Sequence, residues 1–108
     1  MARYIVDIEC NGLVPGEVVK LHCCHLKEID TGEILRFRHT DHENTIEEGV
    51  RLLQTADLII GHNIIKFDIP VLQQFYPWFK PGGTLFDTLV GPRLVYTDLK
   101  DRDFALAL

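Results

Sequence analysis

The chain has 108 residues, of which 46% are hydrophobic and 25% are charged, a composition typical of one globular domain. Its formal net charge of -5 excludes a protein that grips phosphate backbones through bulk positive charge, so a nucleic-acid function would need metal ions or a partner. No apolar run has the length of a membrane span and no signal peptide precedes the first predicted strand. We therefore expect a cytoplasmic protein without membrane contact, and its odd set of three cysteines to be reduced thiols.

The first third of the chain predicts three strands in an antiparallel meander. Residues 3–9 form a strand with two distinct sides, one carrying Tyr4, Val6 and Ile8 and the other Ile5, Asp7 and Glu9. Further strands are predicted over residues 18–26 and 34–38, with a tight turn at Asp30-Thr31-Gly32 between them.

Helices and strands alternate in the rest of the chain. Asn44 is expected to cap a helix, and Glu47, three residues later, can complete a capping box. The next predicted segments are a buried parallel strand over 58–60, a helix over 67–75, a short strand over 85–86 and a helical stretch over 88–95. This order predicts one α/β domain over residues 1–108, with helices packed on a mixed sheet. The apolar end of the chain carries no helix-stop signal, so we expect the fold to be incomplete at its C-terminal side.

Asp7 and Glu9 form the first part of a candidate site. Two positions apart on a strand, their carboxylates project from one face, roughly 7 Å apart at the backbone. Like charges held this close raise one another's pKa unless a cation lies between them, so the pair predicts a bound ion or a shifted acid. Carboxylate oxygens favour Mg²⁺ or Mn²⁺ over zinc.

Asp68 is the third candidate acid. It ends the run Gly61-His62-Asn63-Ile64-Ile65-Lys66-Phe67-Asp68, which follows a predicted buried strand and opens a helix. If that strand neighbours the first one, Asp68 lies near the carboxyl edge of the sheet beside Asp7 and Glu9. Three acids would then face one cleft.

Several motifs occur in an order that resembles a known enzyme family. They are Asp7-Ile8-Glu9, His62-Asn63 with Phe67-Asp68, Phe86-Asp87-Thr88-Leu89, Arg93-Leu94 and Asp98-Leu99-Lys100-Asp101. Together they resemble the first two motifs, and the segment after them, of DEDD-family 3′-5′ exonuclease (proofreading) domains in family A DNA polymerases of small-tailed bacteriophages. The resemblance covers nearly the whole chain.

This resemblance implies an RNase H-like fold and a two-metal hydrolysis of the 3′-terminal phosphodiester of single-stranded DNA. The catalytic and metal-binding acids would be Asp7, Glu9 and Asp68, which would hold two Mg²⁺ or Mn²⁺ ions. The terminal nucleotide would contact four residues, namely Leu13, His62, Asn63 and Phe67, with Leu13 as an apolar wedge. A polymerase domain would follow in the longer protein, in the cytoplasm of a bacterium or a phage-infected cell.

One element of the family pattern is missing from the chain. The family has a fourth acid in a Tyr-x-x-x-Asp or His-x-x-x-Asp motif, whereas Tyr96 is followed four residues later by Lys100. We therefore expect impaired activity. The alternative is a catalytically silent, truncated or degenerate domain that acts as a weak metal-binding, DNA-binding or interaction module. Truncation would expose apolar surface through which copies of the chain could associate.

Three features have alternatives that the sequence leaves open. Asp87 either caps the helix predicted after it or supports the cleft from behind the metal ligands. His62 and Asn63 could serve only a turn. The run His22-Cys23-Cys24-His25, with His39 and His42 nearby, suggests zinc, but the spacing matches no usual zinc module, and only alternate residues share a strand face.

Overall fold

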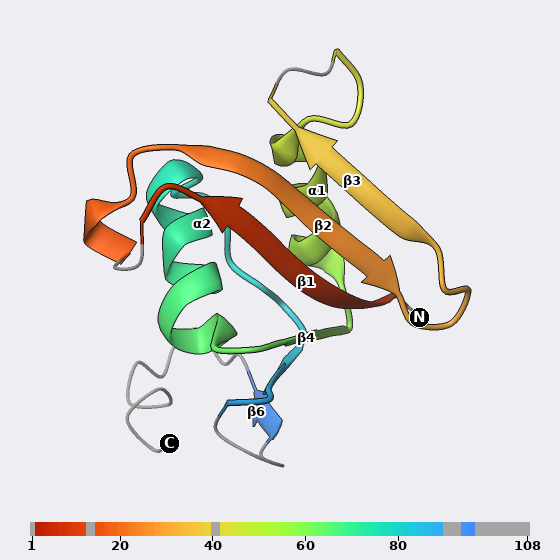
Figure 1. The fold of residues 1–108 in the computed structure, drawn as a ribbon. Coiled ribbons are helices and arrows are strands. Elements are labelled where there is room, and N and C mark those ends of the chain that lie inside the picture. Colours follow the sequence, from red (N-terminus) through yellow and green to blue (C-terminus); the bar gives the residue numbers. More distant parts are fainter. Residues whose placement is uncertain (1, 13–14, 40–41, 90–93, 97–108) are drawn as a thin grey trace.

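The computed structural model describes residues 2–12, 15–39, 42–89 and 94–96. Within them the chain forms one sheet in the order β3-β2-β1-β4-β5-β6 (Figure 1). The strands are β1 (Arg3–Cys10), β2 (Leu21–Glu28), β3 (Ile34–Arg38), β4 (Leu58–Gly61), β5 (Thr84–Asp87) and β6 (Leu94–Tyr96). β4 runs parallel to both β1 and β5, and the other neighbouring pairs are antiparallel. The predicted mixed sheet and its antiparallel N-terminal meander are confirmed.

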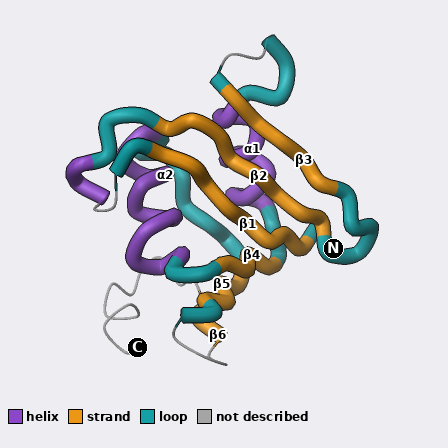
Figure 2. Tube along the Cα trace, in the orientation of Figure 1, coloured by secondary structure: helices purple, strands orange, loops and turns teal. Residues whose placement is uncertain are grey.

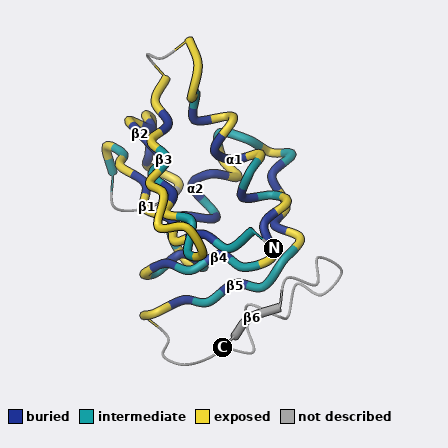
Figure 3. Tube along the Cα trace, turned by 90° about the vertical axis from the view of Figure 1, so that its right-hand side faces the viewer, coloured by how far each residue is buried: buried dark blue, intermediate teal, exposed yellow. Residues whose placement is uncertain are grey.

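Helices α1 (Ile46–Thr55) and α2 (Ile69–Phe75) pack on one face of this sheet (Figure 2). Side chains alternate between the two faces of β1, and the helices cover the face that carries Tyr4, Val6 and Ile8, which are buried. Their neighbours Ile5, Asp7 and Glu9 are exposed on the opposite, open face. Fully buried side chains from both layers complete the core, including Leu26, Val50, Leu53, Ile59, Val71 and Leu72. Figure 3 shows that exposed residues gather in the loops, including the one between β3 and α1.

The second strand starts at Leu21, three residues later than predicted. A short 3₁₀ turn, η1 (Pro15–Glu17), precedes it, and Val18 is fully buried in the core although it lies outside the strand. The N–H groups of Val19 and Lys20 donate to the side-chain oxygen of Asn11, at 3.1 and 3.0 Å. These bonds hold a loop conformation, which an apolar pattern alone does not distinguish from a strand.

The cap of α1 lies one residue later than predicted. Thr45, not Asn44, is the N-cap, and its hydroxyl accepts the N–H of Glu48 at 3.4 Å. In return, the side-chain carboxylate of Glu48 accepts the N–H of Asn44 at 3.0 Å. The reciprocal capping interaction therefore uses Glu48 and not Glu47. Asn44 instead adopts a positive φ of 58°, a conformation that asparagine tolerates.

Two predictions for the second half need correction. The helix predicted over 67–75 ends at Phe75 as expected, but the helical segment begins earlier, as a π-helix, η2 (Ile64–Asp68), and α2 follows from Ile69, so Asp68 lies at the end of η2. The helical stretch predicted over 88–95 is wrong where the structure describes it, because Leu94–Tyr96 form β6 against β5. In the part of the chain that is described, no helix combines the length and apolar character needed to cross a bilayer.

Candidate active site

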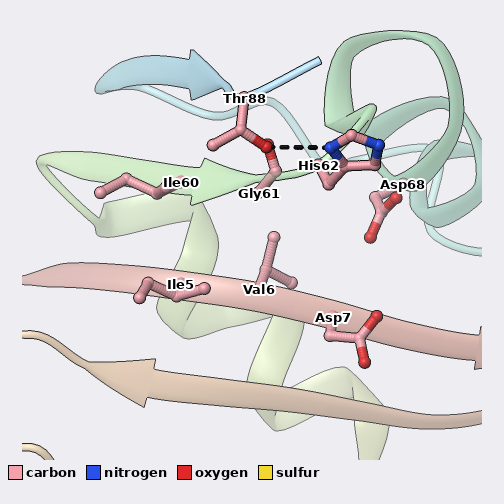
Figure 4. A pocket seen from close by; sticks show the side chains of 8 residues that line it. All are labelled: Ile5, Val6, Asp7, Ile60, Gly61, His62, Asp68 and Thr88. Carbon is pink, nitrogen blue, oxygen red and sulfur yellow. Dashed lines mark hydrogen bonds between the residues drawn. The ribbon is translucent and has the colours of Figure 1, made fainter.

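Asp7 and Asp68 line the same pocket. Its volume is about 380 Å³, and its walls come from β1, β4 and the segments that follow β4 and β5, namely Ile5, Val6, Asp7, Ile60, Gly61, His62, Asp68 and Thr88. Figure 4 shows the Asp68 carboxylate directed toward the strand that carries Asp7. Two acids far apart in the sequence therefore meet at one opening.

The pocket exists because β1 extends past the end of β4. The parallel pairing of the two strands runs from Arg3 with Leu58 to Ile5 with Ile60. β4 ends one residue later, whereas β1 continues to Cys10 and carries Asp7 beyond that end. Open space at the carboxyl edge of a parallel pair is a common position for ligand sites in α/β sheets.

Gly61 allows the chain to turn at this edge. A Cβ atom placed there would overlap the Cγ2 atom of Ile64 and lie 3.2 Å from the carbonyl oxygen of Val6. A side chain at this position would thus push the turn away from β1. The absence of one lets η2 begin directly beside the pocket.

Asp87 anchors the same turn from the neighbouring strand. It is 1% exposed, and its carboxylate accepts three backbone N–H groups, from Asn63 at 2.8 Å, Ile65 at 3.0 Å and Leu89 at 2.9 Å. Asn63 has a positive φ of 61° and makes no capping bond with its own side chain. Asp87 thus caps the start of η2 through Asn63 and Ile65, and it also accepts the N–H of Leu89, two residues after it. Residues 90–93, in the helical stretch that Asp87 was predicted to cap, lie outside the described residues. A carboxylate reaching across strands gives no local sequence signal.

The π-helix delivers Asp68 to the pocket in an unusual electrostatic environment. Asp68 is 7% exposed, and burial is the main cause that raises the pKa of its carboxyl to about 7. The negative charges of Asp7 and, to a smaller extent, Asp87 also raise it, while contacts with the backbone of Asp68 and Ile8 lower it. A buried acid beside another acid is a candidate functional group, because its neutral and charged forms are close in free energy near neutral pH.

His62 and Thr88 form the polar rim opposite Asp7. The Nδ1 atom of His62 lies 3.1 Å from the hydroxyl of Thr88 (Figure 4). Thr88 also donates its N–H to the carbonyl of Gly61 at 2.9 Å, which fixes it at the end of β5. Thr88 is not among the site residues predicted from the sequence. The signal that could have found it is its position directly after a strand parallel to β4.

Three other predicted site residues, Glu9, Asn63 and Phe67, are described by the structure but do not line the pocket. Glu9 lies on the same open face of β1 as Asp7 but one step farther along the strand. Asn63 and Phe67 are half-buried, Asn63 in the turn and Phe67 against the core. Leu13 lies outside the described residues. Among the described residues, the structure thus brings together at the pocket two of the three acids, Asp7 and Asp68, and one of the three described nucleotide contacts, His62.

Within residues 2–12, 15–39, 42–89 and 94–96, no three His, Cys, Asp or Glu side chains are arranged so that they could hold a metal ion. Alternate residues of the His22–His25 run lie on opposite faces of the sheet, since Cys24 is in the core and Cys23 is on the open face with Glu9. Burial is the main cause that raises the pKa of the Cys24 thiol to about 12, so this thiol is a poor metal ligand.

No protein-family model matches the chain. The chain is 31% identical over 108 residues to the DNA-directed DNA polymerase of Escherichia phage T7, and equally to that of Enterobacteria phage T3. Each alignment covers 94% of this chain and 15% of the polymerase. The chain thus spans less than a sixth of the length of these relatives, and the similarity supports a relationship with one region of a phage DNA polymerase.

Proposed function

We propose that this chain forms the first part of a metal-dependent 3′-5′ exonuclease domain with an RNase H-like fold, the proofreading module of a DNA polymerase. The observation that carries the proposal is the meeting of Asp7 and Asp68 at one pocket beside the ends of parallel strands. The similarity to a region of two phage DNA polymerases supports the same function. The polymerase domain would be the partner within the longer protein.

The donor set fits a hard divalent cation such as Mg²⁺ or Mn²⁺. Asp7 and Asp68 offer carboxylate oxygens to one space, and a cation there would favour the charged form of the buried Asp68 carboxyl. Glu9, next on the same face of β1, would add oxygen ligands from the side. When two such ions are bound, they stabilise the attacking and leaving oxygens of an in-line displacement at phosphorus.

The pocket itself supports binding of a terminal nucleotide. Ile5 and Ile60 give it an apolar wall against which a sugar or base can pack. If the Thr88 hydroxyl donates to the Gly61 carbonyl, 3.4 Å away, His62 Nδ1 is the donor to Thr88. The Nε2 atom of a neutral His62 then remains as an acceptor for a hydroxyl of the substrate. Asn63, Phe67 and Leu13 are proposed to complete this surface.

A second candidate is a catalytically silent domain that binds metal or DNA weakly. Two observations favour it for the chain by itself. The sequence has no Tyr-x-x-x-Asp or His-x-x-x-Asp motif, and the described residues contain no group of three metal ligands. We therefore expect the 108-residue chain to cleave weakly or not at all.

Metal binding and cleavage can be tested separately. Calorimetric titration with Mn²⁺ should show weak binding that Asp7→Ala reduces and Glu43→Ala, an exposed acid outside the pocket, leaves unchanged. A 3′-labelled single-stranded oligonucleotide with Mn²⁺ should release mononucleotides slowly at most, and only with Asp7 intact. Mn²⁺ binding that is identical in the Asp7→Ala variant would refute the proposed site. Rapid, Asp7-dependent cleavage would refute the silent alternative and show that another acid completes the site.

A further inference from the structure

Basic residues lie on the neighbouring strands β2 and β3, on the open face of the sheet. The register pairs His25 of β2 with Asp7 on one side and Arg36 of β3 on the other, and pairs Cys23 with Glu9 and Arg38 in the same way. Residues paired in register share a face of the sheet. We call Lys27, Arg36 and Arg38, all exposed on this face, the basic strip.

The charges of the basic strip are not neutralised within the described residues. Arg3 and Arg51 pair with Asp30 and Glu47, but none of the three strip residues forms an ion pair with a described acid. The pKa of the Cys23 thiol is raised chiefly by burial. The charge of Glu9 raises this pKa further and the charge of Arg38 lowers it, so both charges act on the same position of the open face. Two rows thus run from a cation on β3 to an acid on β1.

The other side of the open face is apolar. Ile5 is 41% exposed, and the register places Ile60 and then Phe86 beside it, both half-buried. Ile5 and Ile60 also line the pocket with Asp7. The face therefore changes from basic on β3 to acidic on β1 to apolar on β4 and β5.

We propose that the basic strip binds the sugar–phosphate backbone of a single-stranded nucleic acid whose end reaches the pocket at Asp7 and Asp68. This inference rests on the proposed function and names the surface that guides its substrate. A single strand presents phosphates and unpaired bases together, which matches a face with cations beside the exposed Ile5 and the half-buried Ile60 and Phe86. A duplex offers its bases only inside grooves and would leave the apolar row unused. In a chain with a net charge of -5, such a local strip supplies the attraction that the whole molecule lacks.

Fluorescence anisotropy with a fluorescein-labelled oligothymidylate, in EDTA so that no cleavage occurs, tests this surface. The double variant Arg36→Gln/Arg38→Gln should bind more weakly, and its slope of log affinity against log salt should fall by about 1.4, given ~0.7 per contacted phosphate of a single strand. The matched control Arg51→Gln/Lys80→Gln changes the net charge equally, but its residues lie on α1 and in the α2–β5 connection. Its slope should stay unchanged.

A conservative variant separates lost charge from lost structure. Arg36→Lys/Arg38→Lys should keep most of the affinity, because phosphate binding here needs charge more than a fixed hydrogen-bond geometry. Equal affinity and slope in the glutamine variant and its control would overturn the proposal, as would equally tight binding of a duplex of the same length. Because EDTA removes the metal ions, this assay reports nucleic-acid binding alone. Failure of the basic strip to bind would therefore be distinguishable from failure of the proposed nuclease function, which the metal titration and the cleavage assay test.

Discussion

The carboxylate of Asp87 accepts the backbone N–H of Asn63 at 2.8 Å, and this bond ties the end of β5 to the turn after β4. The same carboxylate also accepts the N–H groups of Ile65 and Leu89, so one buried side chain binds three backbone donors. Asp87 is itself 1% exposed, so water has little access to its carboxylate. The position of the pocket wall that carries His62 thus depends on a residue from another strand.

Asp87→Asn is expected to destabilise the fold by about 1–3 kcal/mol, because an amide NH₂ would replace one acceptor and leave a buried N–H unpaired. Urea unfolding followed by circular dichroism would measure the change. Glu43→Gln, on an exposed acid, is the control and should stay within about 0.5 kcal/mol. If both variants unfold at the same urea concentration, Asp87 does not anchor the turn.

The stability of the metal-free chain should fall as pH rises from about 4 to about 7. Burial and Asp7 raise the folded-state pKa of Asp68 from 3.8 to about 7, so in this window the folded state retains a proton that the unfolded state has lost. Each pH unit across the window should lower the free energy of unfolding by up to ~1.4 kcal/mol. Thermal unfolding in EDTA would detect the slope, and Asp68→Asn should remove it. A slope unchanged in that variant would assign it to another group.

Gly61→Ala should destabilise the chain by about 1–3 kcal/mol, because the new methyl group would overlap Ile64 and crowd the carbonyl of Val6. Gly16→Ala is the matched control, since a Cβ there meets no atom within 4 Å. Urea unfolding of the two variants compares the same chemical change in a crowded and an open position. Similar stability of both would mean that β4 does not approach η2 as closely as described.

Thr45→Ala should cost about 1 kcal/mol, because it removes the hydroxyl that caps α1 through the N–H of Glu48. Asn44→Gly removes the other candidate side chain while keeping a residue that adopts the positive φ of 58°, and it should not reproduce this loss. Chemical unfolding of both variants would rank them. A larger loss for Asn44→Gly than for Thr45→Ala would restore Asn44 as the capping residue.

The sequence predicted those parts of the fold that depend on local periodicity. The two faces of β1, the bounds of β3 and the buried parallel strand at Leu58–Gly61 follow from alternation and apolar runs. The start of β2 was missed because Val18 is buried from a loop, and β6 because its pairing with β5 is a tertiary interaction.

The sequence predicted the two acids that line the pocket, but not how the residues around them are arranged. The placement of Asp7 and Asp68 at one sheet edge follows from the parallel pairing of β1 with β4, which the sequence pattern suggested. Glu9 shares the face of Asp7, but periodicity does not report whether a side chain reaches a pocket. The π-helix before α2 and the capping bonds of Asp87 depend on neighbouring strands, so no local motif announces them.

The parallel pairing of β1 with β4 also sets when the pocket can appear during folding. The β1–β2–β3 meander joins neighbouring segments, whereas Asp7 and Asp68 meet only after the chain has passed through β3 and α1 and returned to β1. Contacts between such distant segments form late, because closing a long loop costs entropy before any contact compensates for it. A ligand that needs both acids would therefore bind only molecules that have completed this return, and its binding kinetics would report the last stage of folding.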